Sequence, residues 1–175
     1  MTQAMLSEHN RKNVEQKVLV FPAQAKTLAG KQVFFLFSLF QMEDVLTTMN
    51  VQEVPFSPSY LSGITDWRGQ VLPIISLELL LGLKQDSIPY SRRLAVIHSV
   101  NRTNGAEEDL WGIIEISRTI NMMTLPIPCT PANHLMQGKE LFVRGAYEWE
   151  EGILMVMNME NILNGNLTGD GQRVQ

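Results

Sequence analysis

Two stretches of this chain resemble each other at a constant spacing of 82 residues (145 − 63 = 82). The segment GITDWRGQVLPIISLELLLG begins at Gly63, and the segment GAYEWEEGILMVMNMENILN begins at Gly145. Each copy has the pattern of a strand, a tight turn, a second strand and a short helix. Five of the twenty aligned positions are identical without a gap: Gly63/Gly145, Trp67/Trp149, Leu72/Leu154, Glu78/Glu160 and Leu81/Leu163. The repeat predicts a duplicated module, with two similar sub-barrels in one chain.

Most of the chain between its ends consists of short apolar runs. They are five to nine residues long, are rich in β-branched and aromatic residues, and are separated by Pro, Gly and Asn, as in KVLVFPA, KQVFFLFSL, RLAVIHSV and LWGIIEIS. This length and composition are typical of strands, so the sequence predicts an all-β barrel or sandwich. We expect one domain over residues 17–165, with flexible tails at 1–16 and 166–175.

Two segments carry helical signals. In LFQMEDVLTTM, apolar residues recur at steps of three and four, which predicts an amphipathic helix. The residues concerned are Leu39, Met42, Val45, Leu46 and Met49. The segment SLELLLGL predicts a short helix, with Ser76 as its N-cap and Gly82 at its end. In the second copy Asn158 takes the place of Ser76, and we expect it to cap a helix as well.

Composition excludes several classes of protein. The net charge of −4 and the pI near 5.4 argue against general nucleic-acid binding, which needs clustered Lys and Arg. The single cysteine, Cys129, cannot form an internal disulfide, which fits a reducing compartment. The longest apolar run, VFFLFSLF, is far shorter than the roughly 20 residues of a membrane-spanning helix. We expect a cytoplasmic protein that does not itself insert into a membrane.

The sequence contains no recognisable catalytic constellation. Cys129 lies five residues before His134, but no second pair completes a zinc site and no third group would orient a nucleophile and base. No glycine-rich phosphate loop follows a strand, and the adjacent acidic residues are in turn-like or exposed contexts. The sequence therefore predicts no enzyme, no metal and no cofactor, and favours a binding role.

Charge distinguishes the turns of the two copies. Arg68 and Gly69 stand at the turn of the first copy, opposite Glu150 and Glu151 in the second. A guanidinium presents five donors in a planar fork that suits carboxylates and carbonyls. Arg68 could therefore bind a partner, or it could stack on the neighbouring Trp67 and hold the fold together. The residues alone leave both interpretations open.

The segment PFSPSYLSGITDWRGQVLPIISLELLLG, from Pro55 to Gly82, resembles a motif of the CheW-like chemotaxis coupling domain. That motif reads P-x-x-P-x-Y, then a glycine, Asn-Leu-Arg-Gly, a proline, Asp-Leu and a closing Leu-Gly. The chain has the expected residue at eight positions: Pro55, Tyr60, Gly63, Arg68, Gly69, Pro73, Leu77 and Gly82. The family's Asn-Leu is replaced here by Asp66-Trp67. The resemblance extends over about residues 17–163.

The resemblance implies a fold and a role. The family's fold consists of two intertwined five-stranded β-barrels with short helices. Its members are adaptors that couple the cytoplasmic tips of chemoreceptors to the regulatory domain of a CheA-type histidine kinase, beside membrane receptor arrays. Some relatives serve type IV pilus or other chemosensory-like pathways. An accessory or ligand-sensing domain in such a pathway is the alternative function.

The resemblance also implies a receptor-binding site near the Arg68–Gly69 turn. We expect apolar residues around the first copy to line a groove for a receptor helix, with Arg68 fixing its orientation. The predicted receptor-binding residues are Arg68, Gly69, Val45, Val54, Leu61 and Ile64.

Overall fold

The computed structural model describes residues 16–85, 93–103, 106–117 and 119–165. Apart from Gln16, the predicted tails at 1–16 and 166–175 lie outside these residues and stay predictions. The described chain forms two β-sheets and four short helical segments. The prediction of an all-β fold with short helices is therefore confirmed.

One sheet has five strands in the order β3-β7-β8-β5-β4. They are β3 (Met42–Leu46), β7 (Arg93–Thr103), β8 (Ala106–Ile116), β5 (Gln70–Ile75) and β4 (Leu61–Trp67). The other sheet has seven strands in the order β10-β11-β12-β2-β1-β6, with β9 also paired to β1. They are β10 (Thr130–Pro131), β11 (Val143–Trp149), β12 (Gly152–Met157), β2 (Gln32–Ser38), β1 (Lys17–Lys26), β6 (Lys84–Gln85) and β9 (Asn121–Thr124).

The sequence repeat is a structural repeat. The hairpin β4–β5 and the hairpin β11–β12 have the same bounds after a shift of 82 residues (143 − 61 = 82 and 157 − 75 = 82). Each is followed by a helix, α1 (Leu77–Leu80) or α2 (Met159–Leu163). Their strand registers are also equivalent, and both contain a bulge just before Gly63 or Gly145. The predicted strand, turn, strand and helix are confirmed in both copies.

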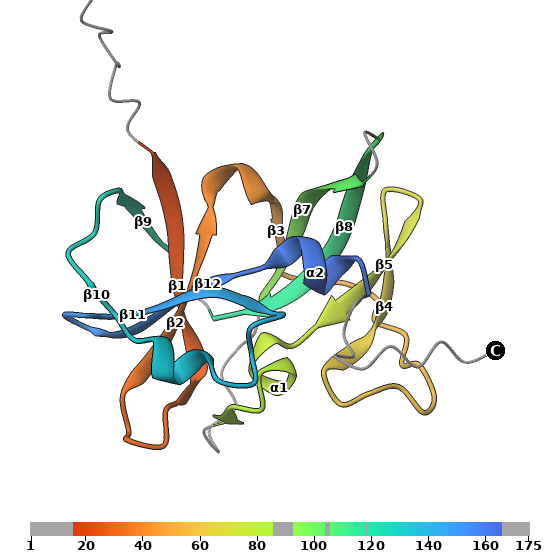
Figure 1. Cartoon of the computed structure of the whole chain (residues 1–175). Coiled ribbons are helices and arrows are strands. Elements are labelled where there is room, and N and C mark those ends of the chain that lie inside the picture. The colour runs from red at the N-terminus through yellow and green to blue at the C-terminus, as the bar shows by residue number, and fades with distance from the viewer. Residues whose placement is uncertain (1–15, 86–92, 104–105, 118, 166–175) are drawn as a thin grey trace, which may run out of the picture.

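The equivalence continues beyond the repeated segment. β5 lies parallel to β8, and β12 lies parallel to β2. In the five-stranded sheet, β8 pairs with the antiparallel strand β7, and β7 pairs with β3. In the other sheet, β2 pairs in the same way with β1, and β1 pairs with β9. Each sheet thus contains the same five-strand arrangement. The middle of the chain builds one of them, while the two ends combine β1 and β2 with β11 and β12, so the two units are intertwined (Figure 1).

A short stretch of chain joins the two edges of each sheet. After β3, Gln52 exchanges two backbone hydrogen bonds of 2.9 Å with Ile64 of β4. After β9, β10 pairs with β11, and the Ala132 N–H donates to the Ala146 carbonyl at 2.8 Å. Strand pairing does not run round a closed ring among the described residues, but both units curl in the same barrel-like way.

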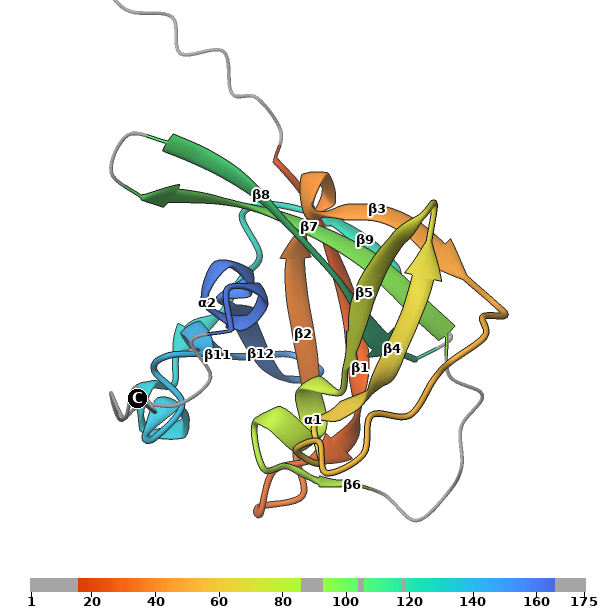
Figure 2. The same cartoon turned by 90° about the vertical axis from the view of Figure 1, so that its right-hand side faces the viewer.

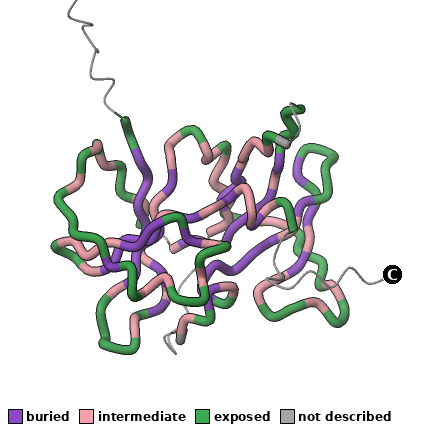
Figure 3. The backbone as a smooth tube through the Cα atoms, in the orientation of Figure 1, coloured by how far each residue is buried: buried purple, intermediate pink, exposed green. Residues whose placement is uncertain are grey.

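The hydrophobic core has three parts. The largest lies between the two units and includes side chains from both, such as Phe21 and Phe37, which stack at 5.0 Å, and Ile97 and Met155. A smaller cluster around Trp67 fills the five-stranded unit, and a third around Phe34 fills the other. The buried backbone accordingly concentrates at the centre of the molecule (Figure 3). β7 and β8 extend beyond it as a two-stranded arm (Figure 2).

The helix predicted over LFQMEDVLTTM is wrong. The structure has a single 3-10 turn, η1 (Leu39–Gln41), capped by Ser38, and the chain then enters β3. β3 pairs with β7, so hydrogen bonds to a neighbouring strand replace those of a helix. The spacing of apolar residues could not reveal this, because tertiary pairing overrides a weak local preference.

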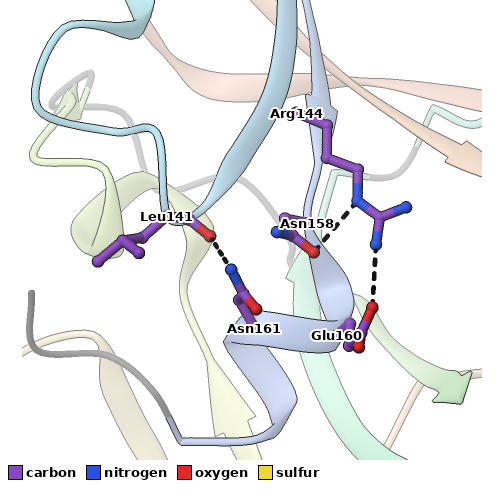
Figure 4. Close-up of polar contacts among 5 residues, drawn as sticks. All are labelled: Leu141, Arg144, Asn158, Glu160 and Asn161. Atoms are coloured by element: carbon purple, nitrogen blue, oxygen red, sulfur yellow. Dashed lines mark hydrogen bonds and ion pairs between the residues drawn. The ribbon is translucent and has the colours of Figure 1, made fainter. Parts of the chain in front are cut away.

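The two short helices begin differently. Ser76 caps α1 as predicted, since its Oγ accepts from the Leu79 N–H at 3.4 Å. Asn158 is the N-cap residue of α2, as predicted, but its side chain makes no capping hydrogen bond. Its Oδ1 instead accepts from Arg144 Nε at 3.2 Å, and the same guanidinium lies 3.3 Å from Glu160 (Figure 4). Arg144 is the bulge residue of β11, so a cation from the hairpin takes the oxygen that would cap the helix.

Gly63 lies where β4 closely approaches the linker, which is the segment 47–60 between β3 and β4. Its φ is +150°, and a Cβ there would lie 2.6 Å from the Gln52 carbonyl oxygen. We expect Gly63→Ala to destabilise the protein by about 2 kcal/mol or more, because the new methyl must displace a backbone bridge. Urea unfolding monitored by circular dichroism measures the loss.

Gly30→Ala is the matched control. Gly30 also has positive φ (+78°), but a Cβ there meets nothing within 4 Å, so only conformational strain of about 1 kcal/mol is expected. Equal losses in the two variants would show that the bridge between Gln52 and β4 is not a steric constraint.

Candidate partner-binding site

Arg68 and Gly69 form the two-residue loop between β4 and β5. Their φ angles are +54° and +80°, so both residues have left-handed backbone. Positive φ at both central positions is the pattern of a type I′ turn, which favours Asn-Gly. The Asp66 carboxylate accepts from the Gly69 N–H at 3.1 Å and supports the turn. An arginine therefore occupies a position where the backbone favours a different residue.

The equivalent turn of the second repeat differs in its backbone as well as its charge. Neither Glu150 nor Glu151 has positive φ. The glycine with positive φ is Gly152, one residue after the position equivalent to Gly69. The β-hairpin therefore does not require the Arg68 conformation, because the duplicated hairpin closes without it. The conformation is specific to the first copy.

The side chain of Arg68 reaches across the end of the five-stranded sheet. Its guanidinium carbon lies 4.4 Å from the centre of the Trp67 ring, which is a cation–π distance. Its nitrogens lie 3.7 Å from Glu43 and 3.9 Å from Asp44, both on β3 at the opposite edge of the sheet. These distances exceed the length of a hydrogen bond. The side chain is 65% exposed, so its N–H groups face solvent and can bind an acceptor.

A groove lies next to this turn, between β4, β5 and the chain that follows β3. Its volume is about 360 Å³. We call it the linker groove; it is lined by Thr48, Met49, Asn50, Gln52, Ile64, Thr65, Asp66 and Val71. Met49, Ile64 and Val71 are its apolar lining residues, the others are polar, and Asp66 is the one charged residue among them.

The structure places the predicted apolar residues on more than one surface. Ile64 lines the linker groove. Val45, on β3, is half-buried against the core between the two units. Leu61 is the first residue of β4, and Val54 lies in the linker; both are half-buried and neither lines the groove. Four of the six predicted residues, Arg68, Gly69, Leu61 and Ile64, therefore belong to the β4–β5 hairpin, and of the six only Ile64 lines the groove.

Three exposed apolar residues of this region were not predicted. Val71 follows the turn, lines the linker groove and is 64% exposed. Val51 and Phe56 are exposed on the linker, and Phe56 also has a positive φ of +59°. An aromatic residue between two prolines in a loop, Pro55 and Pro58, was the available sequence signal for Phe56. For Val71 there was none, because the nearly continuous apolar run VLPII indicates a strand that is buried on both sides.

A metal site needs a close grouping of ligating side chains. Within the ranges given above, no three His, Cys, Asp or Glu side chains are grouped so that they could hold a metal ion. His98 pairs with Asp109 across β7 and β8 at 3.0 Å, and Cys129 is exposed. No helix in this part of the chain has the length and apolar character needed to cross a bilayer.

Comparison with known proteins agrees with this geometry. Residues 19–167 match the model of the CheW-like domain family. A probable chemotaxis protein CheW from Rhizobium etli is 32% identical over an alignment 82 residues long; the match covers 42% of this chain and 52% of that protein. The alignment thus spans about half the length of that relative.

A solved structure shares the fold. The scaffolding protein TtCheW from Thermoanaerobacter tengcongensis superposes with a TM-score of 0.60 at 15% identity, over 88% of this chain and 91% of that one. At this identity the likeness concerns the fold alone. Because the family model matches most of the chain, and the duplicated barrel-like units match the solved fold, this protein belongs to the CheW-like domain family.

Proposed function

We propose that this chain is an adaptor that couples the cytoplasmic tips of chemoreceptors to the regulatory domain of a CheA-type histidine kinase. The chain belongs to the CheW-like domain family, the solved protein of the same fold is described as a scaffolding protein, and the chain is not an enzyme, as the sequence predicts. The described residues form surfaces suited to docking, and the Rhizobium relative is named as a chemotaxis protein. We place the protein in the cytoplasm, beside membrane receptor arrays.

The observation that carries this proposal is the state of Arg68. It has left-handed backbone where Asn or Gly is preferred, and its guanidinium makes two long, exposed ion pairs. Exposed pairs of this kind contribute about 0–1 kcal/mol, so they give the fold little in return for the strained conformation. Donors held over an indole ring beside a groove are well placed to bind carbonyl or carboxylate oxygens of a partner.

The linker groove supplies the apolar half of the proposed contact. Ile64 and Val71 face it, and a receptor helix could lay its apolar side chains against them. Arg68 would then fix the position of that helix by charge-assisted hydrogen bonds. The second unit would remain free for the kinase. One molecule could thus contact both partners, and an array could form from many weak contacts acting together.

The direct experiment is a pull-down with two partners from the source organism, a receptor cytoplasmic tip fragment and a kinase regulatory domain. We expect the folded chain to retain both, separately and together. Retention of neither, by protein with a native circular dichroism spectrum, would reject the adaptor function. Retention of a pilus-pathway receptor but not a swimming receptor would assign the adaptor to that branch of the family.

Arg68→Asn separates a structural role from a binding role. Asparagine suits the type I′ backbone, so the variant should unfold at the same denaturant concentration as the wild type or slightly higher. Its receptor affinity should nevertheless fall roughly tenfold, since a central charged contact is lost. Arg68→Glu should weaken receptor binding further, while the melting temperature falls by no more than about 3 °C. Isothermal titration calorimetry measures the affinities.

Arg102→Glu is the control for charge alone. Arg102 is an exposed arginine on the β7–β8 arm, paired with Glu107 at 3.1 Å. We expect its substitution to leave receptor affinity unchanged. If Arg68→Asn loses stability and affinity together, Arg68 holds the fold and is not a binding residue.

Val71→Glu tests the linker groove. Val71 is exposed, so the variant should fold with near wild-type stability, within about 0.5 kcal/mol. A charge in an apolar contact should reduce receptor binding at least tenfold. Met122→Glu, at a similarly exposed position on β9 of the other sheet, should bind receptor normally. Unchanged binding by Val71→Glu would place the receptor contact outside the groove.

A further inference from the structure

A second and larger cleft lies where the two units meet. It is lined by the turn between β1 and β2, the end of α1, the 3-10 helix η2 (Asn133–Met136) and strand β12. In Figure 1 the β1–β2 turn, α1 and the teal 3-10 helix lie in the lower part of the picture, and β12 lies at its middle. The volume of the cleft is about 1000 Å³, the upper end of the range for small-molecule sites. We call it the junction cleft.

The interior of the junction cleft is apolar. Ile153 and Met155 of β12 are buried beneath it. Leu83, after α1, and Leu135, on η2, are half-buried at its sides. Leu28 is fully exposed at its mouth, on the turn between β1 and β2. A ligand in the cleft would cover apolar surface contributed by both units.

The rim of the junction cleft is cationic. Lys26, Lys31 and Lys139 line it, and Glu148 is the one acidic residue among its lining side chains. With His134 taken as neutral, the three lysines and one glutamate give the cleft lining a net charge of +2, whereas the whole chain has a net charge of −4. Positive charge is thus concentrated around an apolar cleft in an otherwise acidic protein.

The lysines of the rim are not equivalent. Lys31 donates to Glu148 at 2.9 Å, and this hydrogen bond and charge hold the pKa of Glu148 below its ordinary value. The side chains of Lys26 and Lys139 have no hydrogen bond or ion pair with any residue that the structure describes. Lys139 is also half-buried. Two ammonium groups are therefore available to an anion.

Comparison of the two repeats shows that the fold does not dictate this cleft. A shift of 82 residues relates Glu148 and Ile153 to Asp66 and Val71, which line the linker groove of the first unit. That groove is about 360 Å³, and no lysine or arginine lines it. The same scaffold thus carries a small groove without a cation in one copy and a large cationic cleft in the other.

We propose that the junction cleft binds a small amphiphilic anion, with its apolar body on β12 and η2 and its acidic group between Lys26 and Lys139. Charge-assisted hydrogen bonds from two ammonium groups would hold the acidic group, while burial of the apolar body supplies the rest of the affinity. This site is separate from the Arg68 turn, and its existence does not depend on the adaptor function. A ligand bound there would contact both units and so influence how they pack together.

Three probes with the same ten-carbon chain test the proposal: decanoate, decanol and decyltrimethylammonium, each below its micelle concentration. We expect decanoate to bind the full chain, and the other two to bind at least tenfold more weakly. In a nitrogen–proton correlation spectrum, decanoate should shift the amide signals of Gly82 and Gly138, which flank the cleft, and leave that of Gly69 unmoved. Added salt should weaken binding.

The variant Lys26→Gln/Lys139→Gln provides a second measurement. Its affinity for decanoate should fall roughly tenfold or more. The control variant Lys17→Gln/Arg102→Gln loses the same two charges from surfaces outside the cleft and should bind like the wild type. Lys31 is kept in both, because its removal would leave Glu148 unpaired.

Several outcomes would overturn the site. These are absence of decanoate binding to the wild type, equal binding of the cationic probe, or equal losses in the two double variants. If the cleft variant fails to fold, the amide shifts of the wild type still decide, since shifts centred on Gly69 would place the anion elsewhere. The receptor pull-down is unaffected by any of these results.

Discussion

The parallel pairing of β12 with β2 is the contact on which the rest of the structure depends. Among the described residues it joins the last strand to the second, over the register from Ile153 opposite Val33 to Val156 opposite Leu36. Without it, the second copy of the repeated hairpin would have no sheet to complete. The core between the two units needs side chains from both, so it forms only when the ends of the chain have met. Neither unit can therefore be removed as a separate piece.

Local features of this fold could be predicted from the sequence, and long-range features could not. The two hairpins and α1 follow from turn residues, alternation and a cap within twenty residues, and the 82-residue repeat shows that they occur twice. The stretch that forms β3 carries apolar residues at helical spacing, but β7, about fifty residues later in the chain, decides its conformation. Asn158 likewise has the right type for a cap, and only the approach of Arg144 explains why its oxygen is used elsewhere.

In the candidate site, too, the local features could be predicted from the sequence and the long-range features could not. The Arg68–Gly69 turn could be located from its sequence, because two turn residues between paired strands define a hairpin. The linker groove depends on the bridge between Gln52 and Ile64, which brings together residues from two separate segments. Sequence reasoning found Ile64 and missed Val71, although both lie on the same hairpin. Which side of a strand faces a groove depends on what packs against it, and that is a property of the whole fold.

Duplication gives this protein an internal control for each of its surfaces. Where both copies agree, as in strand register, bulge position and the tryptophan before the turn, the fold requires the feature. Where equivalent positions of the two copies differ, the fold tolerates both versions, so the fold alone does not explain the difference. The left-handed Arg68 and the lysines of the junction cleft both fall in this second class. Because the hairpin closes as well with Glu150 and Glu151, hairpin closure does not account for an arginine in a strained conformation, and we propose binding to another molecule as the reason.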